Sequence, residues 1–594
     1  MAALPEAPLH TSQTSFSAAS RREAQTAGGD SDVRLPYGFG KFQLLIMLGT
    51  IVAGATFTLH DESFRLTAGV MDHWCQRPFK FANLSVAEWK QLAIPLDVDG
   101  EYSHCTVREP PNGGRAARIV SCTAWEYDLG TYGNNIVSEW NLVCHRRWLV
   151  DLARLAYSAS CMASLCLFGV AADRVGRRVV VFVAVPVVLV AGVGGGLPRD
   201  LHFFVAVRCL VSAAASALLP PLLALTYEVS PTSKIPAYTV ATWVVTLLMV
   251  PPTLVVTQAV KGGWAVTQLL VMLPTSLLVT LYYTIDESPA WLLVNGRVEE
   301  AERVAARAAR LNGLPTGSGD LFASQRYLHA REAAPKDPAG PFLLCSKRLW
   351  QRTILLTFCW TALTYCYVSF ISNEAIFVSL VVNLIDMFLS TCAAILVARF
   401  IPRFGFKLSV VTSALVSAAT SAVLAAIYTD DETVLRNSLL LVMRMAGNVS
   451  LMFFITLAVN CYPVSIHCTA LGAGLAFSRL GDTLAQMVPR LLRGRHAEVH
   501  LAVAAILMTL FAAATEFLPP EADWKLARSV THVKSTVTTD HTGEELRHEL
   551  QHTLVPLPKK RLHGRRSSRR DKNQLSLDEQ HSTHSISRST LRDF

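Results

Sequence analysis

The sequence has little charge for its length. Of its 594 residues, 17% are charged, whereas an average soluble domain has about 25%. Hydrophobic residues make up 51%, and the mean hydropathy is +0.34. This composition excludes disordered, collagenous and coiled-coil proteins. It leaves a large soluble multidomain protein or a protein that crosses a membrane many times.

The sequence also lacks the signatures of several function classes. A Walker A string is absent, which argues against an ATP-driven machine. Gly-x-Ser-x-Gly is absent and no cysteine has a catalytic His/Asn setting, so we expect no enzyme and no cofactor. The first 41 residues are polar, so we expect no cleavable signal peptide.

The apolar residues are concentrated in twelve runs, each near the roughly 20 residues that cross a bilayer as a helix. Most runs lack the polar face of a soluble helix. They therefore predict an all-α membrane protein with twelve transmembrane helices. The runs are Phe42–Leu59, Trp148–Val170, Val179–Leu197, Phe203–Leu225, Ala237–Val260, Val266–Ile285, Thr353–Ile371, Ala375–Val397, Leu408–Tyr428, Leu439–Ala458, Ala470–Leu491 and Val499–Leu518.

Basic residues in the short loops set the orientation, because cytosolic loops are rich in Lys and Arg. They place both termini in the cytosol, with Arg493 and Arg495 as the one exception. Similar strings after spans 2 and 8, and after spans 4 and 10, indicate two related six-helix halves. The predicted parts are a cytosolic segment (1–41), a first half (42–285) with an extracellular loop (60–147), a cytosolic central loop (286–352), a second half (353–518) and a cytosolic basic tail (519–594).

The predicted extracellular loop carries four cysteines and a glycosylation sequon. An even number of cysteines outside the cell predicts two disulfides, with three possible pairings. No pair has the C-x-x-C spacing of a zinc site, so we expect no metal. The sequon begins at Asn83, and a second one, at Asn448, falls inside a span and should stay unmodified. The cysteines are Cys75, Cys105, Cys122 and Cys144.

Several strings resemble known signatures. The stretch after span 2 resembles the loop 2–3 signature of the major facilitator superfamily; its residues are Gly169, Asp173, Arg174, Gly176, Arg177 and Arg178. Its glycines permit tight turning, and its basic residues anchor the cytosolic face. More specific strings resemble the organic cation/anion/zwitterion transporters of that superfamily. They are Asp72-His-Trp-Cys75, Glu139-Trp-Asn-Leu-Val-Cys144 and Asp286-Glu-Ser-Pro-Ala-Trp-Leu-Leu293, which contains Glu287.

The resemblance implies the major facilitator fold and a cytosolic gate held by charged residues, with Glu228 after span 4 among them. The chain departs from the family at several gate positions. Ala290, Ile235 and His467 each stand where the family has an arginine. Phe406 stands where the family has a basic residue, and Asn460 stands where it has an acidic one. These replacements suggest either a divergent transporter or a receptor.

Charged residues inside spans are costly, so they usually line a cavity or have a partner. Arg479 aligns with a family position that is Arg in anion or carnitine transporters. A buried guanidinium binds carboxylates in a fork, so we expect an anionic or zwitterionic substrate. The alternative is a structural Arg479 paired with Asp386 or Asp482. The candidate substrate-binding residues are Arg479, Asp386, Arg208, Arg444, Trp360, Tyr365 and Trp243, the aromatics by cation–π contact.

The C-terminal tail has a basic cluster, Lys559–Lys572, with eight Lys/Arg residues. Such a cluster attracts anionic lipid at about 1 kcal/mol per charge. Because the chain is tied to a membrane, lipid is favoured over nucleic acid as a partner. A disordered, solvated tail that binds neither is favoured over both.

The leading hypothesis is a plasma-membrane transporter of small organic ions that works by alternating access. The alternative is a family member without transport that acts as a receptor or scaffold. A sugar transporter of the same superfamily is less favoured, because the outer cysteine loop argues against it.

Overall fold

The structure, a computed structural model, describes residues 37–69, 71–97, 100–113, 117–130, 133–197, 200–260, 263–314, 344–346, 349–371, 380–427, 433–491 and 497–519. Within these ranges, nine helices are long and apolar enough to cross a bilayer. The prediction of a multi-span helical membrane protein is therefore confirmed. The basic cluster Lys559–Lys572 lies outside the described residues.

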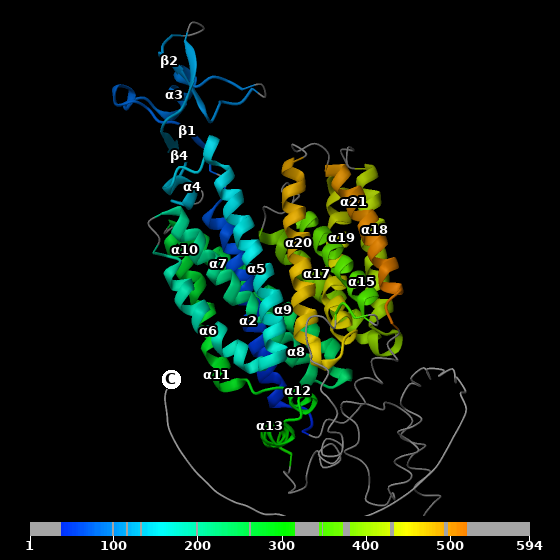
Figure 1. Cartoon of the computed structure of the whole chain (residues 1–594). Coiled ribbons are helices and arrows are strands. Elements are labelled where there is room, and N and C mark those ends of the chain that lie inside the picture. Colours follow the sequence, from blue (N-terminus) through cyan, green and yellow to red (C-terminus); the bar gives the residue numbers. More distant parts are fainter. Residues whose placement is uncertain are drawn as a thin grey trace, which may run out of the picture. The chain divides into compact units, whose positions relative to one another are not determined.

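The helices form two groups that lie side by side in Figure 1. The first group is α2 (Lys41–Thr67), α5 (Trp148–Val175), α6 (Arg177–Gly194), α7 (Leu201–Ala217), α8 (Leu219–Val229), α9 (Ile235–Val260), α10 (Gly263–Thr275) and α11 (Leu281–Thr284). The second group is α15 (Trp350–Ile371), α17 (Leu380–Phe404), α18 (Phe406–Ile427), α19 (Thr433–Asn460), α20 (His467–Leu491) and α21 (Ala497–Glu516). Each of the twelve predicted spans overlaps a helix or a pair of consecutive helices.

The fourth predicted span is interrupted where the chain contains two consecutive prolines. Helix α7 ends at Ala217, and α8 begins at Leu219 with Pro220 and Pro221 in its first turn. Proline has no N–H to donate to the preceding turn, so the hydrogen-bond ladder breaks there. This break separates the two parts of the span.

Each group contains a glycine with positive φ that connects two consecutive helices. Gly176 (φ +113°) connects α5 to α6, and Gly405 (φ +86°) connects α17 to α18. Such positive φ values favour glycine, which has no Cβ. The two joints occupy the positions at which the sequence shows its similar strings.

One glycine of the loop signature has a different role from the predicted one. Gly169 does not turn the chain, because it lies inside α5. A Cβ on Gly169 would come within 2.6 Å of the carbonyl oxygen of Cys468 in α20. Gly169 therefore permits two helices to approach closely, and the prediction of a turn was wrong for this residue.

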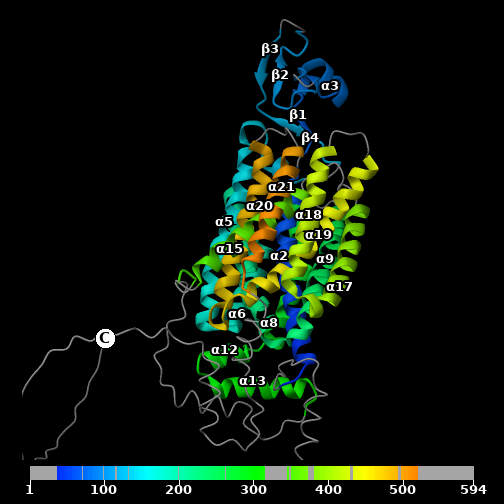
Figure 2. The same ribbon diagram turned by 90° about the vertical axis from the view of Figure 1, so that its right-hand side faces the viewer.

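Residues 71–146 form a small module beyond the ends of the helices, which we call the disulfide module (Figure 2). Strand β1 (His73–Cys75) pairs antiparallel with β4 (Trp125–Tyr127), and β2 (Thr106–Glu109) pairs antiparallel with β3 (Arg118–Ser121). Two short helices, α3 (Val86–Ala93) and α4 (Ile136–Glu139), complete it. Of the three possible cysteine pairings, the structure has Cys75–Cys122 and Cys105–Cys144.

The first helix extends further than the hydropathy predicts. The predicted span ends at Leu59, but α2 continues to Thr67. His60 and Asp61, which the sequence assigns to the outer loop, are therefore helical. This extension places two ionisable side chains among the helices.

Two helices of the central segment lie at the opposite end of the bundle from the disulfide module, which we call the α13 end (Figure 2). They are α12 (Pro289–Val294) and α13 (Val298–Leu311). Arg307 of α13 pairs with Asp286 at 2.9 Å, and the amide oxygen of Asn312 accepts from the N–H of Phe42 at the start of α2. The central segment is thus attached to the first group.

Candidate functional site

A buried charge cluster lies at the α13 end of the first group. The Arg177 guanidinium is 3.1 Å from Asp173 and 3.0 Å from Glu228, and all three side chains are almost completely buried. A buried ion pair is stable only when further hydrogen bonds satisfy its remaining atoms. Here, several of those bonds come from the second group.

The second group meets this cluster with the start of α20 and the preceding 3-10 turn, η7 (Val464–Ile466). The Asp173 carboxylate accepts the backbone N–H groups of Cys468 (3.2 Å) and Thr469 (2.6 Å). An anion is favourable at a helix start, where N–H groups are free and the helix dipole is positive. Arg177 also donates to the carbonyl oxygen of Val464 at 3.0 Å.

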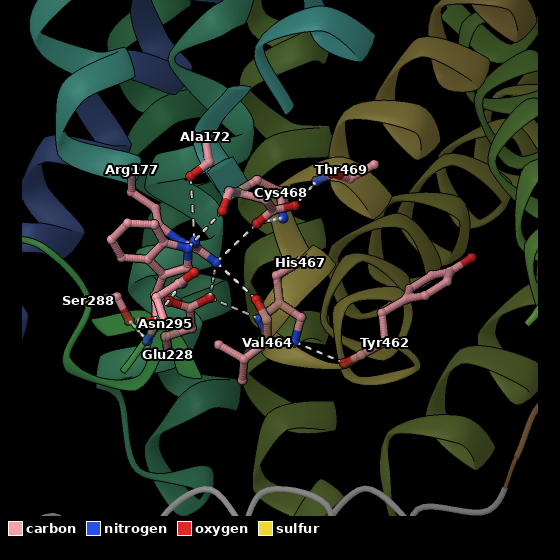
Figure 3. Close-up of polar contacts among 12 residues, drawn as sticks. Ala172, Arg177, Glu228, Ser288, Asn295, Tyr462, Val464, His467, Cys468 and Thr469 are labelled. Carbon is pink, nitrogen blue, oxygen red and sulfur yellow. Dashed lines mark hydrogen bonds and ion pairs between the residues drawn. The ribbon is translucent and has the colours of Figure 1, made fainter. Parts of the chain in front are cut away.

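A histidine completes the contact between the groups (Figure 3). His467, the first residue of α20, has Nδ1 3.0 Å from Glu228 Oε1 and Nε2 3.0 Å from the carbonyl oxygen of Tyr462. We call Asp173, Arg177, Glu228, Glu287 and His467 the inter-group network. It joins helices of both groups at one end of the bundle.

Glu287 supports the network from the segment before α12. Its two carboxylate oxygens accept the N–H groups of Arg177 and Arg178, each at 3.1 Å, at the start of α6. Burial raises the pKa of the Glu287 carboxyl, while these N–H bonds and the Arg177 charge act against that increase. A Cβ on Gly176 would meet Glu287 Oε2 at 2.5 Å, so this contact requires glycine.

Trp291, which lies in the same Asp286–Leu293 string as Glu287, packs on the ion pair. Trp291 donates its indole N–H to the carbonyl oxygen of Asp173 at 2.9 Å, and its ring lies 5.2 Å from the Arg177 guanidinium. Arg174 of the loop 2–3 signature, by contrast, is exposed. That signature therefore contains two buried network residues, Asp173 and Arg177, and a solvent-facing one.

Positions that depart from the family pattern are occupied in other ways. Ile235 and Ala290 are buried apolar residues, and the Phe406 ring packs against Phe453 with centroids 6.3 Å apart. Asn460 donates to the carbonyl oxygen of Thr456 on its own helix. His467, at a position where the resemblance predicts an arginine, makes a polar contact with Glu228 across the groups.

A second charged cluster connects the groups through Arg479. Its guanidinium is 2.8 Å from Asp61 on α2 and 2.9 Å from Asp482 on α20, and it lies over the Phe57 ring at 4.3 Å. Asp482 is thus a partner of Arg479, as one alternative proposed. The other alternative, a pair with Asp386, is wrong because Asp386 lies 3.2 Å from Arg444. The sequence reasoning did not identify Asp61.

The remaining candidates lie within single groups. Arg208 is buried and donates to the carbonyl oxygen of His60 (2.7 Å) and to Ser63 Oγ (3.2 Å), all in the first group. Trp243 lines a pocket in that group, whereas Trp360 lines a different pocket in the second. The Tyr365 side chain is buried on α15. Trp243 and Trp360 thus line separate pockets, although Trp243 packs against the apolar cluster that contains Trp360 and Tyr365.

The comparison with known families shows to which family the chain belongs. The family model described as "Sugar (and other) transporter" matches residues 144–521, which is more than half of the chain. The chain belongs to this family.

The curated relatives include members of solute carrier family 22. Member 7 from Rattus norvegicus is 28% identical over 355 residues, covering 56% of this chain and 65% of the relative. The chain thus spans less than two thirds of that relative. Member 6 from Mus musculus is 24% identical, covering 88% of this chain and 96% of the relative. A beta-alanine transporter from Drosophila melanogaster is 24% identical, covering 56% and 60%.

Solved structures show the same fold. The proton:xylose symporter XylE, bound to 6-bromo-6-deoxy-D-glucose, superimposes with a TM-score of 0.58 at 15% identity, covering 80% of this chain and 96% of that one. A partially occluded, inward-open XylE from E. coli gives a TM-score of 0.51 at 14% identity, covering 81% and 98%. These likenesses show that the chain shares the fold of XylE.

Proposed function

We propose that the chain is a plasma-membrane carrier of small organic ions, built from twelve transmembrane helices in two six-helix halves that work by alternating access. The observation that carries this proposal is the inter-group network. It closes the two helix groups at the α13 end through hydrogen bonds and ion pairs, which can form and break as one half rocks against the other. The replaced gate positions do not remove this contact, so the transporter is favoured over the receptor.

The charge distribution supports a cytosolic α13 end. Exposed basic residues, Arg174 and Lys234, occur there, as expected for loops on the cytosolic side. The disulfide module then faces the extracellular space, where disulfides persist. In this orientation we expect both termini to be cytosolic, and we expect the Lys559–Lys572 cluster to meet anionic lipid on that side.

The orientation can be tested through the sequon in the disulfide module. Asn83 is exposed, and Ser85 caps α3 by accepting the N–H of Glu88. We expect one N-linked glycan, which Asn83→Gln removes. On a gel, this variant should migrate like the wild type after peptide N-glycosidase treatment. Asn448→Gln should not change the migration, because Asn448 is buried and donates to Ser390 Oγ. A glycan remaining on Asn83→Gln would contradict the assignment.

The direct experiment is uptake of radiolabelled compounds into cells that express the chain. The panel contains carnitine, dicarboxylates and quaternary ammonium compounds, with surface biotinylation to measure the protein at the membrane. We expect at least one compound to enter above the vector control. If none does while the protein reaches the surface, the transporter proposal fails.

We further propose that Arg479 binds the anionic part of the substrate. Asp61 and Asp482 both contact its guanidinium, and a substrate carboxylate would compete with them for it. Arg479→Ala leaves two carboxylates without their cation. We therefore expect anion uptake to fall at least about tenfold, equivalent to about 1.4 kcal/mol, and cation uptake to fall less.

Arg479→Lys is the matched control for this prediction, because it retains the charge without the guanidinium fork. It should preserve part of the anion uptake. An equal loss of anion and cation uptake in Arg479→Ala, at normal surface expression, would show that Arg479 is structural.

A further inference from the structure

Both ring nitrogens of His467 face hydrogen-bond acceptors (Figure 3). Nε2 lies 3.0 Å from the carbonyl oxygen of Tyr462, and Nδ1 lies 3.0 Å from Glu228 Oε1. A carbonyl oxygen only accepts, so Nε2 must carry a proton. A neutral imidazole has only one N–H, and the contact with Tyr462 already uses it.

The second contact therefore needs a second proton. Glu228 Oε1 also accepts from Arg177 Nη2 at 3.0 Å, as expected for an ionised carboxylate. Nδ1 must then donate to Glu228, which makes His467 an imidazolium. Even if the proton lay nearer to Glu228, the pair would hold one proton more than a neutral histidine beside a carboxylate. The closed contact is thus a protonated state.

The surrounding charges favour this extra proton. His467 faces Glu228 from α8 and Arg177 from α6, while Asp173 of α5 binds the two N–H groups that follow it and Glu287 lies behind Arg177. Without the proton, this buried set has three carboxylates and one guanidinium. Adding a positive charge reduces the excess of negative charge, and that excess is costly where water is excluded. The helix dipole opposes a cation at the start of α20, and the negative charge of the adjacent Asp173 acts against this effect.

We propose that His467 is a proton-binding site of the inter-group network, and that closure at the α13 end requires this proton. This inference rests on the proposed alternation between two states. When the groups separate, His467 faces the solution at the α13 end, so the proton leaves and returns on that same side. The proton therefore regulates the carrier without being carried across the membrane.

The direction of the effect follows from the charge. Because the closed contact binds one proton more than the open state, each unit by which the pH on the α13 side rises lowers the closed population relative to the open one by at most about tenfold. The closed state then loses its proton and the open state gains population. Acidification on that side has the opposite effect and favours closure.

The neighbouring Cys468 offers a native reporter of the opening. Its side chain is completely buried in the closed contact, and separation of the groups exposes it at the α13 end. We would label full-length protein in permeabilised membranes with a maleimide between about pH 6.5 and pH 8. Mass spectrometry then measures the labelling of Cys468 relative to the exposed Cys345, which corrects for the pH dependence of thiol reactivity.

Two variants of His467 serve as controls for this measurement. His467→Arg carries a permanent cation, so its labelling ratio should stay constant across this range. His467→Gln cannot carry the proton, so its ratio should be high throughout. We expect the wild-type ratio to rise about tenfold relative to His467→Arg.

A wild-type ratio that does not change with pH would overturn the proposal, even if a variant fails to fold. A rise of equal size in His467→Arg would also overturn it. The labelling measurement needs no substrate. The pH dependence of Cys468 labelling can therefore be absent while uptake is observed, or present while no uptake is observed. The two outcomes separate this inference from the proposed transport function.

Discussion

Arg177→Ala should reduce substrate uptake at least about a hundredfold. The substitution leaves Asp173 and Glu228 buried without their cation and removes the bond to Val464. Breaking a buried ion pair by removing one partner costs about 3–5 kcal/mol, equivalent to a factor of about a hundred or more in an equilibrium. The closed state at the α13 end would become rare, so the carrier could not face outward. Initial uptake rates, corrected for surface protein, measure the effect.

Arg174→Ala is the matched control, because Arg174 belongs to the same signature but is exposed. A single exposed charge contributes about 0–1 kcal/mol, so uptake should change little. Labelling of Cys468 should increase in Arg177→Ala and stay low in Arg174→Ala. Normal uptake by Arg177→Ala would show that the buried ion pair is not needed for the cycle.

The second large effect is expected from Gly472→Ala, at the contact between α5 and α20. A Cβ on Gly472 would lie 2.2 Å from the carbonyl oxygen of Leu165, where ordinary contacts are 3.4–4 Å. Because the obstacle is backbone, no side-chain rotation can relieve it, and the helices must separate. Overpacking of this kind costs about 1–3 kcal/mol, so we expect uptake to fall by about tenfold or more.

A glycine on the neighbouring helix provides the control for steric effects. A Cβ on Gly194 of α6 meets nothing within 4 Å among the described residues, so Gly194→Ala should retain normal uptake. The melting temperature of the detergent-solubilised protein should fall for Gly472→Ala only. Equal behaviour of the two alanine variants would mean that the close approach of α5 and α20 is unimportant.

The helices were predictable from the sequence where apolar residues are continuous. The exception is the end of α2, where His60 and Asp61 lower the hydropathy although the helix continues to Thr67. A window of hydropathy measures average polarity, and it cannot see that the polar side chains have partners among other helices. Asp61 was missed for this reason, although Arg479 in another span indicated that an acidic partner was needed.

The sequence predicted several residues of the inter-group network, but it did not predict which of them are in contact. The loop signature and the Glu-Ser-Pro string identified Asp173, Arg177 and Glu287. Their meeting with the start of α20 depends on residues almost 300 positions away, which no local pattern encodes. Four cysteines likewise allow three pairings, and only the folded module selects one.

The hydrogen bonds of Asp173 to α20 have an evolutionary consequence. This carboxylate binds the backbone N–H groups of Cys468 and Thr469, and every residue except proline supplies such a group. The side chains of Cys468 and Thr469 can therefore change by mutation without loss of these two backbone bonds. We expect relatives to tolerate more substitution at these two positions than at Asp173.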